Sequence, residues 1–177
     1  RTITDVFGEH LSGKNHSDVK YFYADGSTVK FFPLGIANFF DNVEMIWVSR
    51  TSLGEIHSSD LQQFGDKLKN LWLHHNSIVM LEENLFQFNE NLESIDFDQN
   101  QLRHIENGTF RGLENLTNFE MDGNHCISKT ETDRNGVITL IDEIELKCKE
   151  FAFIFDKKQA QIDELKYQLH RCDCNLF

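Results

Sequence analysis

The sequence predicts an α/β solenoid of about five stacked repeats, each adding one short parallel strand to a concave face, followed by a C-terminal α-helix of coiled-coil type. The first observation is the pattern L-x-x-L-x-L-x-x-N-x-I over residues 68–78, which returns at Leu92 and at Leu116. The three starts lie 24 residues apart, and an internal period of this length is typical of stacked repeats. The second observation is an apolar stripe from Ile141 onward with alternating spacings of three and four residues, which is typical of a heptad helix.

Each repeat is expected to begin with a strand, because L-x-x-L-x-L alternates with a period of two. Two looser copies start at Val19 and Val43, and they hold Ser27 and Thr51 where asparagine stands in the later copies. The asparagine side chain in this frame is expected to bond backbone groups of its own turn and of the neighbouring turn, and a hydroxyl is expected to do part of that job. Parallel stacking of these strands then forms the concave sheet of a solenoid.

Apolar residues that recur between the strands are expected to fill the convex side, and removing one of them should cost about 3–5 kcal/mol. They form two ladders, Phe32, Ile56, Leu81 and Ile105, and Phe40, Phe64, Phe88 and Leu113. Residues 2–15 are expected to form an N-terminal cap, because an uncapped solenoid exposes a hydrophobic edge. In this cap Ile3, Val6 and Leu11 would cover the open end of the first repeat.

The composition indicates a folded, acidic protein. Hydrophobic residues make up 40% of the 177 residues, which is enough for a sizeable core. The net charge of -12 opposes binding to nucleic acid, which needs a basic face to release counterions, and it equally opposes binding to anionic membranes. No apolar run approaches the roughly 20 residues of a membrane-spanning helix, so we expect no membrane insertion.

Three N-x-S/T sequons, at Asn15, Asn107 and Asn115, predict glycosylation. Together with cysteines clustered toward the end of the chain, they favour a secreted, extracellular glycoprotein. The sequence starts at Arg1 with no methionine and no apolar leader. We interpret it as a processed or trimmed product from which any signal peptide has been removed.

The strand residues between the ladder positions are expected to point outward from the concave face. The central column reads Tyr23, Trp47, Trp72, Asp96 and Glu120, and the next column reads Asp25, Ser49, His74, Asp98 and Asp122. Aromatic residues therefore lie toward the N-terminal end and acids toward the C-terminal end. Exposed Tyr and Trp are typical binding anchors, and the acidic end would steer a basic partner. The alternative interpretation is a solvated strand face with a chance aromatic row.

Metal and catalytic signals are weak. His74 and His75 stand beside Asp98 and Asp122, but adjacent strand residues point to opposite sides, so the two rings seldom share one ion. Residues 131–142 fit an EF-hand loop at positions 3, 5, 6 and 8 but lack the usual Asp at position 1 and Glu at position 12, which favours a polar loop leading into a helix. Since no nucleophile–base motif, phosphate loop or H-E-x-x-H is present, we expect no catalytic residue, no metal and no cofactor.

The four cysteines divide into two kinds. A disulfide between Cys126 and Cys148 would pin the helix over the last repeat and stabilise the fold by about 3 kcal/mol. Cys172 and Cys174 are too close for an unstrained bridge and are expected to form intermolecular disulfides; the alternative is that one of them pairs with an N-terminal cysteine that is missing here. The helix is expected to start at Thr139. Its heptad stripe consists of Ile141, Ile144, Cys148, Phe151, Phe155, Lys158, Ile162, Leu165, Leu169 and Cys172.

The repeats over residues 19–126 resemble extracellular insect leucine-rich repeat proteins. The order of repeats, heptads and terminal cysteines is similar to that of mosquito leucine-rich repeat immune proteins, in which a coiled coil and a cysteine pair join subunits. We divide the chain into a leucine-rich repeat domain with an N-terminal cap (1–127) and a C-terminal cap with the heptad helix (128–177).

Two functions from different classes follow. The first is a secreted, non-enzymatic recognition module, whose concave face binds a protein partner of basic character and whose helix makes homo- or hetero-oligomers. The second is a structural protein that builds extracellular assemblies through the helix and the terminal cysteines. A third arrangement, in which the helix folds back as a simple cap on a monomer, stays open.

Overall fold

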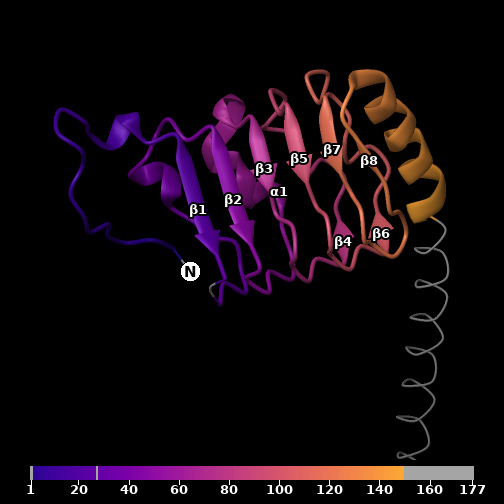
Figure 1. Ribbon diagram of the computed structural model, residues 1–177, viewed down its shortest axis with the longest axis horizontal. Helices are drawn as coiled ribbons and strands as arrows, with labels where there is room; N and C mark the ends of the chain where they lie inside the picture. Colours follow the sequence, from indigo (N-terminus) through magenta and orange to yellow (C-terminus); the bar gives the residue numbers. More distant parts are fainter. Residues whose placement is uncertain (1, 27, 150–177) are drawn as a thin grey trace, which may run out of the picture.

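The computed structural model describes residues 2–26 and 28–149, and they form a curved solenoid (Figure 1). Its main sheet has the order β1-β2-β3-β5-β7-β8. These strands are β1 (Tyr21–Asp25), β2 (Met45–Ser49), β3 (Asn70–Trp72), β5 (Ser94–Asp96), β7 (Asn118–Glu120) and β8 (Thr130–Glu131). The first five are parallel, as the repeat pattern predicts, and β8 is antiparallel to β7.

Short elements link the strands on the other side of the solenoid. They are η2 (Ile36–Asn38), α1 (Ser58–Leu61), η3 (Gln62–Lys67), and the two-stranded parallel sheet of β4 (Met80–Leu81) and β6 (His104–Ile105). A further short helix, η1 (His16–Asp18), precedes β1. The fold is therefore α/β with little helix within the repeats, because each 24-residue period leaves room for one strand and a compact return.

The core follows the predicted strand ladder closely: Leu71, Ile95 and Phe119 are fully buried on three adjacent strands. The second convex ladder contains an error, because Phe88 is 37% exposed whereas Phe86 is buried. Counting in steps of 24 selects Phe88, but the turn in this repeat directs Phe86 inward, where its ring stacks on that of Phe110.

A ladder of buried asparagines joins consecutive turns. Asn76 Oδ1 accepts hydrogen bonds from the backbone N–H groups of Thr51 and Leu53, and its Nδ2 donates to the Val48 carbonyl. Asn100 bonds the preceding turn in the same manner. The expected role of the asparagine frame is thus observed.

The substitution of a hydroxyl for asparagine works differently from the expectation. Thr51 Oγ1 donates to Asn76 Oδ1 in the following repeat, and not to the turn before it. The backbone carbonyl of Thr51 accepts from Val29 N and makes the contact to the preceding turn. At this position the main chain therefore supplies the bond to the preceding turn.

A second ladder is made of glutamates, which the repeat pattern did not identify. Glu82 Oε1 accepts from Ser58 N at 2.7 Å, and Glu106 Oε2 accepts from Glu83 N at 2.7 Å. Glu145, on the C-terminal helix, accepts from Gly108 N at 3.4 Å. Each carboxylate thus accepts a hydrogen bond from a backbone N–H group in an earlier turn, and Glu145 continues this series from the helix.

The N-terminal segment covers the first repeat only in part. Ile3 packs against the core, its N–H donates to the Leu34 carbonyl, and Val6 is half-buried. Leu11 is 82% exposed and Phe7 is 89% exposed, so the prediction that Leu11 covers the open end is wrong. The segment follows a wide path away from the strands (Figure 1).

The C-terminal end is closed by β8 and by a helix that spans residues 134–149 within the described part of the chain. This helix begins five residues before the predicted start at Thr139, because Asp133 Oδ1 accepts from the N–H groups of Asn135 and Gly136 and caps it there. The expected T-x-x-D start is wrong because an aspartate at the preceding turn supplies the cap first.

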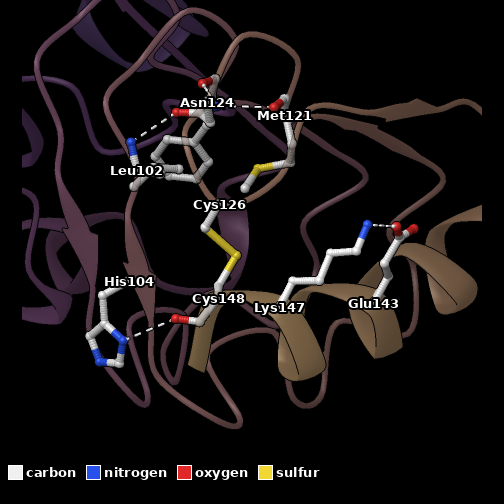
Figure 2. Close-up of a disulfide and its surroundings, with 9 residues drawn as sticks. Leu102, His104, Met121, Asn124, Cys126, Glu143, Lys147 and Cys148 are labelled. Atoms are coloured by element: carbon white, nitrogen blue, oxygen red, sulfur yellow. Dashed lines mark hydrogen bonds and ion pairs between the residues drawn. A yellow bond between two sulfur atoms is a disulfide. The ribbon is translucent and has the colours of Figure 1, made fainter. Parts of the chain in front are cut away.

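The inner face of this helix packs on the last repeat. Ile144 and Cys148 are fully buried and Ile141 is partly buried, so the first three positions of the heptad stripe face the solenoid. A disulfide joins Cys148 to Cys126, with the Cα atoms 5.0 Å apart (Figure 2). The rest of the predicted heptad helix, with Cys172 and Cys174, lies outside the described residues.

Candidate functional site: the concave face

The strand register aligns the predicted central column. Tyr23 pairs with Trp47, Trp47 with Trp72, Trp72 with Asp96, and Asp96 with Glu120. Because the five strands are parallel and unshifted, each side chain lies directly beside its counterpart in the next repeat. The concave sheet therefore carries an aromatic half and an acidic half in one continuous row.

The aromatic half packs against itself. The ring centroids of Trp47 and Trp72 are 4.7 Å apart, and those of Tyr23 and Trp47 are 5.1 Å apart, both in edge-to-face geometry. Trp47 Nε1 donates to Ser49 Oγ and Trp72 Nε1 donates to Ser94 Oγ. The two tryptophans are half-buried rather than fully exposed, and they offer a partner their ring surfaces, because their N–H donors are already used.

Beside the aromatic half, the charge of Asp25 is neutralised within the chain. Arg50 donates two hydrogen bonds to the Asp25 carboxylate, and Ser49 and Tyr23 donate one each. The hydrogen bonds from Arg50 hold the pKa of Asp25 well below its usual value. Ser49 itself is fully buried, so the second column is interrupted at this position.

The acidic half gathers three carboxylates. One oxygen each from Asp96, Asp98 and Glu120 lies within 4.8 Å of the others. Burial raises the pKa of Asp98 to about 6, and the nearby carboxylates of Asp96 and Glu120 add to the effect. Burial also raises the pKa of Asp96. Negative charge is thus concentrated at a partly desolvated place, which favours any cation that can reach it.

His74 and Asp122 flank this group. His74 Nδ1 lies 2.7 Å from Asp96 Oδ2, a close contact in which Nδ1 makes no well-directed hydrogen bond. The Asp122 N–H donates to Asp98 Oδ1, and Ser128 donates to the Asp122 carboxylate. Among the described residues, the acidic half has no arginine or lysine partner comparable to Arg50 at Asp25.

Sequence reasoning missed a third column on the same face. The register places five residues of this column side by side: Tyr21, Met45, Asn70, Ser94 and Asn118. Tyr21 is 69% exposed, and Asn118 Nδ2 donates to both Ser94 Oγ and Glu120 Oε1. The signal was present in the sequence, because these residues occupy the third position of L-x-x-L-x-L in every copy.

The other predicted sites lie away from this face or outside the description. The sequon residues Asn107 and Asn115 are exposed, and Asn15, also exposed, accepts a hydrogen bond from Ser17 N at the start of η1. The EF-hand-like segment 131–142 forms the end of β8 and the start of the helix, where Asp133 serves as the cap. His75 is exposed and its ring packs edge-on to that of His74.

Comparison with known proteins agrees with this architecture. Residues 66–125 match the family model of the leucine rich repeat. This segment is therefore similar to leucine-rich repeats, and the stacked parallel strands of the sheet agree with an α/β solenoid. No curated protein matches the chain. No helix within residues 2–26 and 28–149 is long and apolar enough to span a membrane.

Among solved structures, the chain is similar to a chain of the Drosophila Toll–Spatzle complex, described as a molecular hub in development and innate immunity. The TM-score is 0.57 and the sequence identity is 16%, so the likeness concerns the fold. The match covers 62% of this chain but 14% of the length of that chain.

Proposed function

We propose that this protein is a secreted, non-enzymatic recognition module whose concave face binds a protein partner of basic character. The surface comprises Tyr23, Trp47, Trp72, His74, Asp96, Asp98, Glu120 and Asp122. The observation that carries the proposal is the register, which sets a row of aromatic rings directly beside carboxylates that have no Arg or Lys partner among the described residues. Leucine-rich repeats and the similarity to a chain of the Toll–Spatzle complex support recognition of a protein.

The two halves would act differently on a partner. Trp47 and Trp72 present ring surfaces, which bury large apolar area and attract cations at the ring face. The carboxylates of Asp96, Asp98 and Glu120 attract Lys or Arg, and partial burial makes that attraction stronger than at a fully solvated surface. A basic group held between Trp72 and Asp96 would contact both the ring face and the carboxylate.

Binding can be tested by intrinsic fluorescence, because Trp47 and Trp72 are the two tryptophans of the chain. A short arginine-rich peptide serves as the probe. We expect it to change the tryptophan emission with an affinity that falls as salt is added. Neutralising the acidic half by D96N, D98N and E120Q together should weaken binding about tenfold or more, equivalent to at least ~1.4 kcal/mol.

The matched control also removes three carboxylates, at the exposed positions Glu83, Glu90 and Glu114, by substitution with Gln. Equal losses of affinity in the two triple variants would mean that net charge alone attracts the peptide, and the proposed surface would be wrong. Retention of binding by the concave-face variant would have the same meaning. A loss confined to that variant supports the proposal.

Secretion and oligomerisation belong to the same proposal. The Cys126–Cys148 disulfide and the exposed sequon residues Asn15, Asn107 and Asn115 support an extracellular glycoprotein, since disulfides persist in oxidising compartments. Oligomers through the heptad helix would have to use residues after Cys148, because the earlier stripe positions face the solenoid. The division at residues 127 and 128 remains part of this proposal.

The second candidate is a purely structural role, in which the helix assembles copies of the chain. It is retained because only the first positions of the heptad stripe, up to Cys148, pack on the solenoid. Molecular mass in solution, measured with and without reductant, separates the cases. Loss of higher mass on replacing Cys172 and Cys174 with Ser indicates intermolecular disulfides. An unchanged monomeric mass under every condition indicates a simple cap.

A further inference from the structure

The two ends of the solenoid are closed to different degrees. At the C-terminal end, β8 pairs with β7, and the disulfide-linked helix covers the last repeat. At the N-terminal end, β1 is the outermost strand of the sheet and pairs with β2. Of the eleven large exposed apolar residues in the described part of the chain, six belong to this end: Phe7, Leu11, Tyr21, Tyr23, Phe31 and Leu34. Apolar surface concentrated at one place on a folded protein marks an interaction site.

The open edge of β1 offers a defined set of backbone groups. In the inner strands the buried residues bond the following strand, as Leu73 N does to the Asp96 carbonyl. The outward-facing residues bond the preceding strand, as Asn70 N does to the Glu44 carbonyl. By the same pattern, Tyr21, Tyr23 and Asp25 direct their N–H and C=O groups toward the open side of β1, where no strand precedes it within the described residues.

We propose that β1 pairs in antiparallel fashion with β1 of a second copy of this chain, with Tyr23 opposite Tyr23 on the two-fold axis. The register follows from the backbone N–H and C=O groups of Tyr23, which face the open side of β1. In an antiparallel pair these two groups would bond the C=O and N–H groups of Tyr23 in the other copy. Tyr21 would lie opposite Asp25 of the other copy. The interface is isologous, and it joins the two sheets into one. It shares Tyr23 with the proposed recognition surface, but it does not require that a basic partner is bound.

Side-chain size supports this register. On the core side of β1, Phe22 and Ala24 are partly buried, and they border the apolar end of the repeat. In the proposed pairing Phe22 of one copy lies opposite Ala24 of the other, so a large ring meets a small side chain twice across the axis. Two Phe or two Ala opposite each other would leave a clash or a gap.

The distribution of charge also favours a second copy at this end. Residues 1–44 contain four basic and six acidic residues, a net charge of -2. The remaining residues contain thirteen basic and twenty-three acidic residues, a net charge of -10, which together with -2 gives the total of -12. Two acidic chains repel least where they approach through their nearly neutral ends.

Molecular mass tests the pairing on the whole chain carrying Cys172→Ser and Cys174→Ser, so that terminal disulfides cannot contribute. Sedimentation velocity over a wide range of concentrations should show a monomer–dimer equilibrium. Tyr23→Lys places a charge at the axis and should abolish the dimer. The control Asn118→Lys adds the same charge on the same face of β7 and should leave the dimer intact. A monomer at all concentrations, or the same distribution of species in Tyr23→Lys as in the chain without it, overturns the proposal.

Cysteine cross-linking tests the register itself. Opposite residues of a hydrogen-bonded pair have Cα atoms about 5.5 Å apart, which a disulfide can span. Tyr23→Cys should therefore give a covalent dimer on mild oxidation. Tyr21→Cys should not, because its symmetry mate would lie about 14 Å away along the strand, four residues at ~3.4 Å each. Equal cross-linking at both positions, or none at Tyr23→Cys, contradicts the pairing.

Discussion

Replacing Asn76 with Ala removes a connection between two turns of the solenoid. Asn76 is buried, and its amide is the partner of the backbone N–H groups of Thr51 and Leu53, both at 3.1 Å, and of the Val48 carbonyl at 2.7 Å. Alanine supplies neither donor nor acceptor. Each buried backbone group left without a partner costs about 1–3 kcal/mol.

Water that enters the space of the lost amide will satisfy some of these groups, so we expect a total loss of about 3–5 kcal/mol rather than the full sum. That loss is large against a total stability of roughly 5–15 kcal/mol. Urea unfolding followed by tryptophan fluorescence measures it, provided that the slope of the transition is unchanged.

The control is Asn118→Ala. Asn118 is half-buried on the concave face, and its amide donates to the side chains of Ser94 and Glu120, which water can reach. Its loss should change the free energy of unfolding by less than about 1 kcal/mol. If Asn76→Ala were as mild as Asn118→Ala, the backbone bonds of the asparagine ladder would not hold the turns together.

Three further predictions concern other parts of the molecule. The folded-state pKa of Asp98, about 6, lies above its ordinary value of 3.8, so its contribution raises the free energy of unfolding as pH falls through 6; pH-dependent denaturation of wild type against Asp98→Asn should show this difference, and equal pH profiles would exclude it. Reduction of Cys126–Cys148, which closes a separation of 22 residues, should lower the free energy of unfolding by about 3 kcal/mol, measured by urea unfolding with and without reductant. Phe86→Ala should lose about 3–5 kcal/mol in the same assay and Phe88→Ala less than about 1 kcal/mol, with the reverse order contradicting the observed packing.

The sequence predicted the repeats well because strand burial has a strict period. Leu71, Ile95 and Phe119 recur every 24 residues, and each must face the core if its neighbours do. The same alternation predicted the outward column from Tyr23 to Glu120. The concave geometry therefore follows from residue spacing alone.

The return segments were less predictable, because they have no fixed period of alternation. Phe86 and Phe88 are both apolar, and only the path of the turn decides which one is buried. Exposure of the tryptophans was also misjudged, since a register cannot show that Trp47 and Trp72 pack edge-to-face and shield each other.

The heptad stripe illustrates a different difficulty. A helix that packs on a solenoid and a helix that pairs with another helix both need an apolar face at spacings of three and four. Ile141 and Ile144 satisfy either arrangement, and the structure shows that they contact the last repeat. The disulfide between Cys126 and Cys148 holds this part of the helix against the last repeat, so here the apolar face packs on the solenoid and not on another helix.

The direction of the polar ladders has a consequence for how the chain folds during synthesis. Asn76 and Glu82 both satisfy groups that precede them by about one repeat, and Glu145 does the same for Gly108 from outside the repeats. A ribosome delivers the N-terminal residue first, so every turn emerges before the side chain that completes its hydrogen bonds. Each repeat must wait for the next, and the last must wait for the C-terminal helix, so a nascent chain arrested before Glu145 would carry an unfinished final turn.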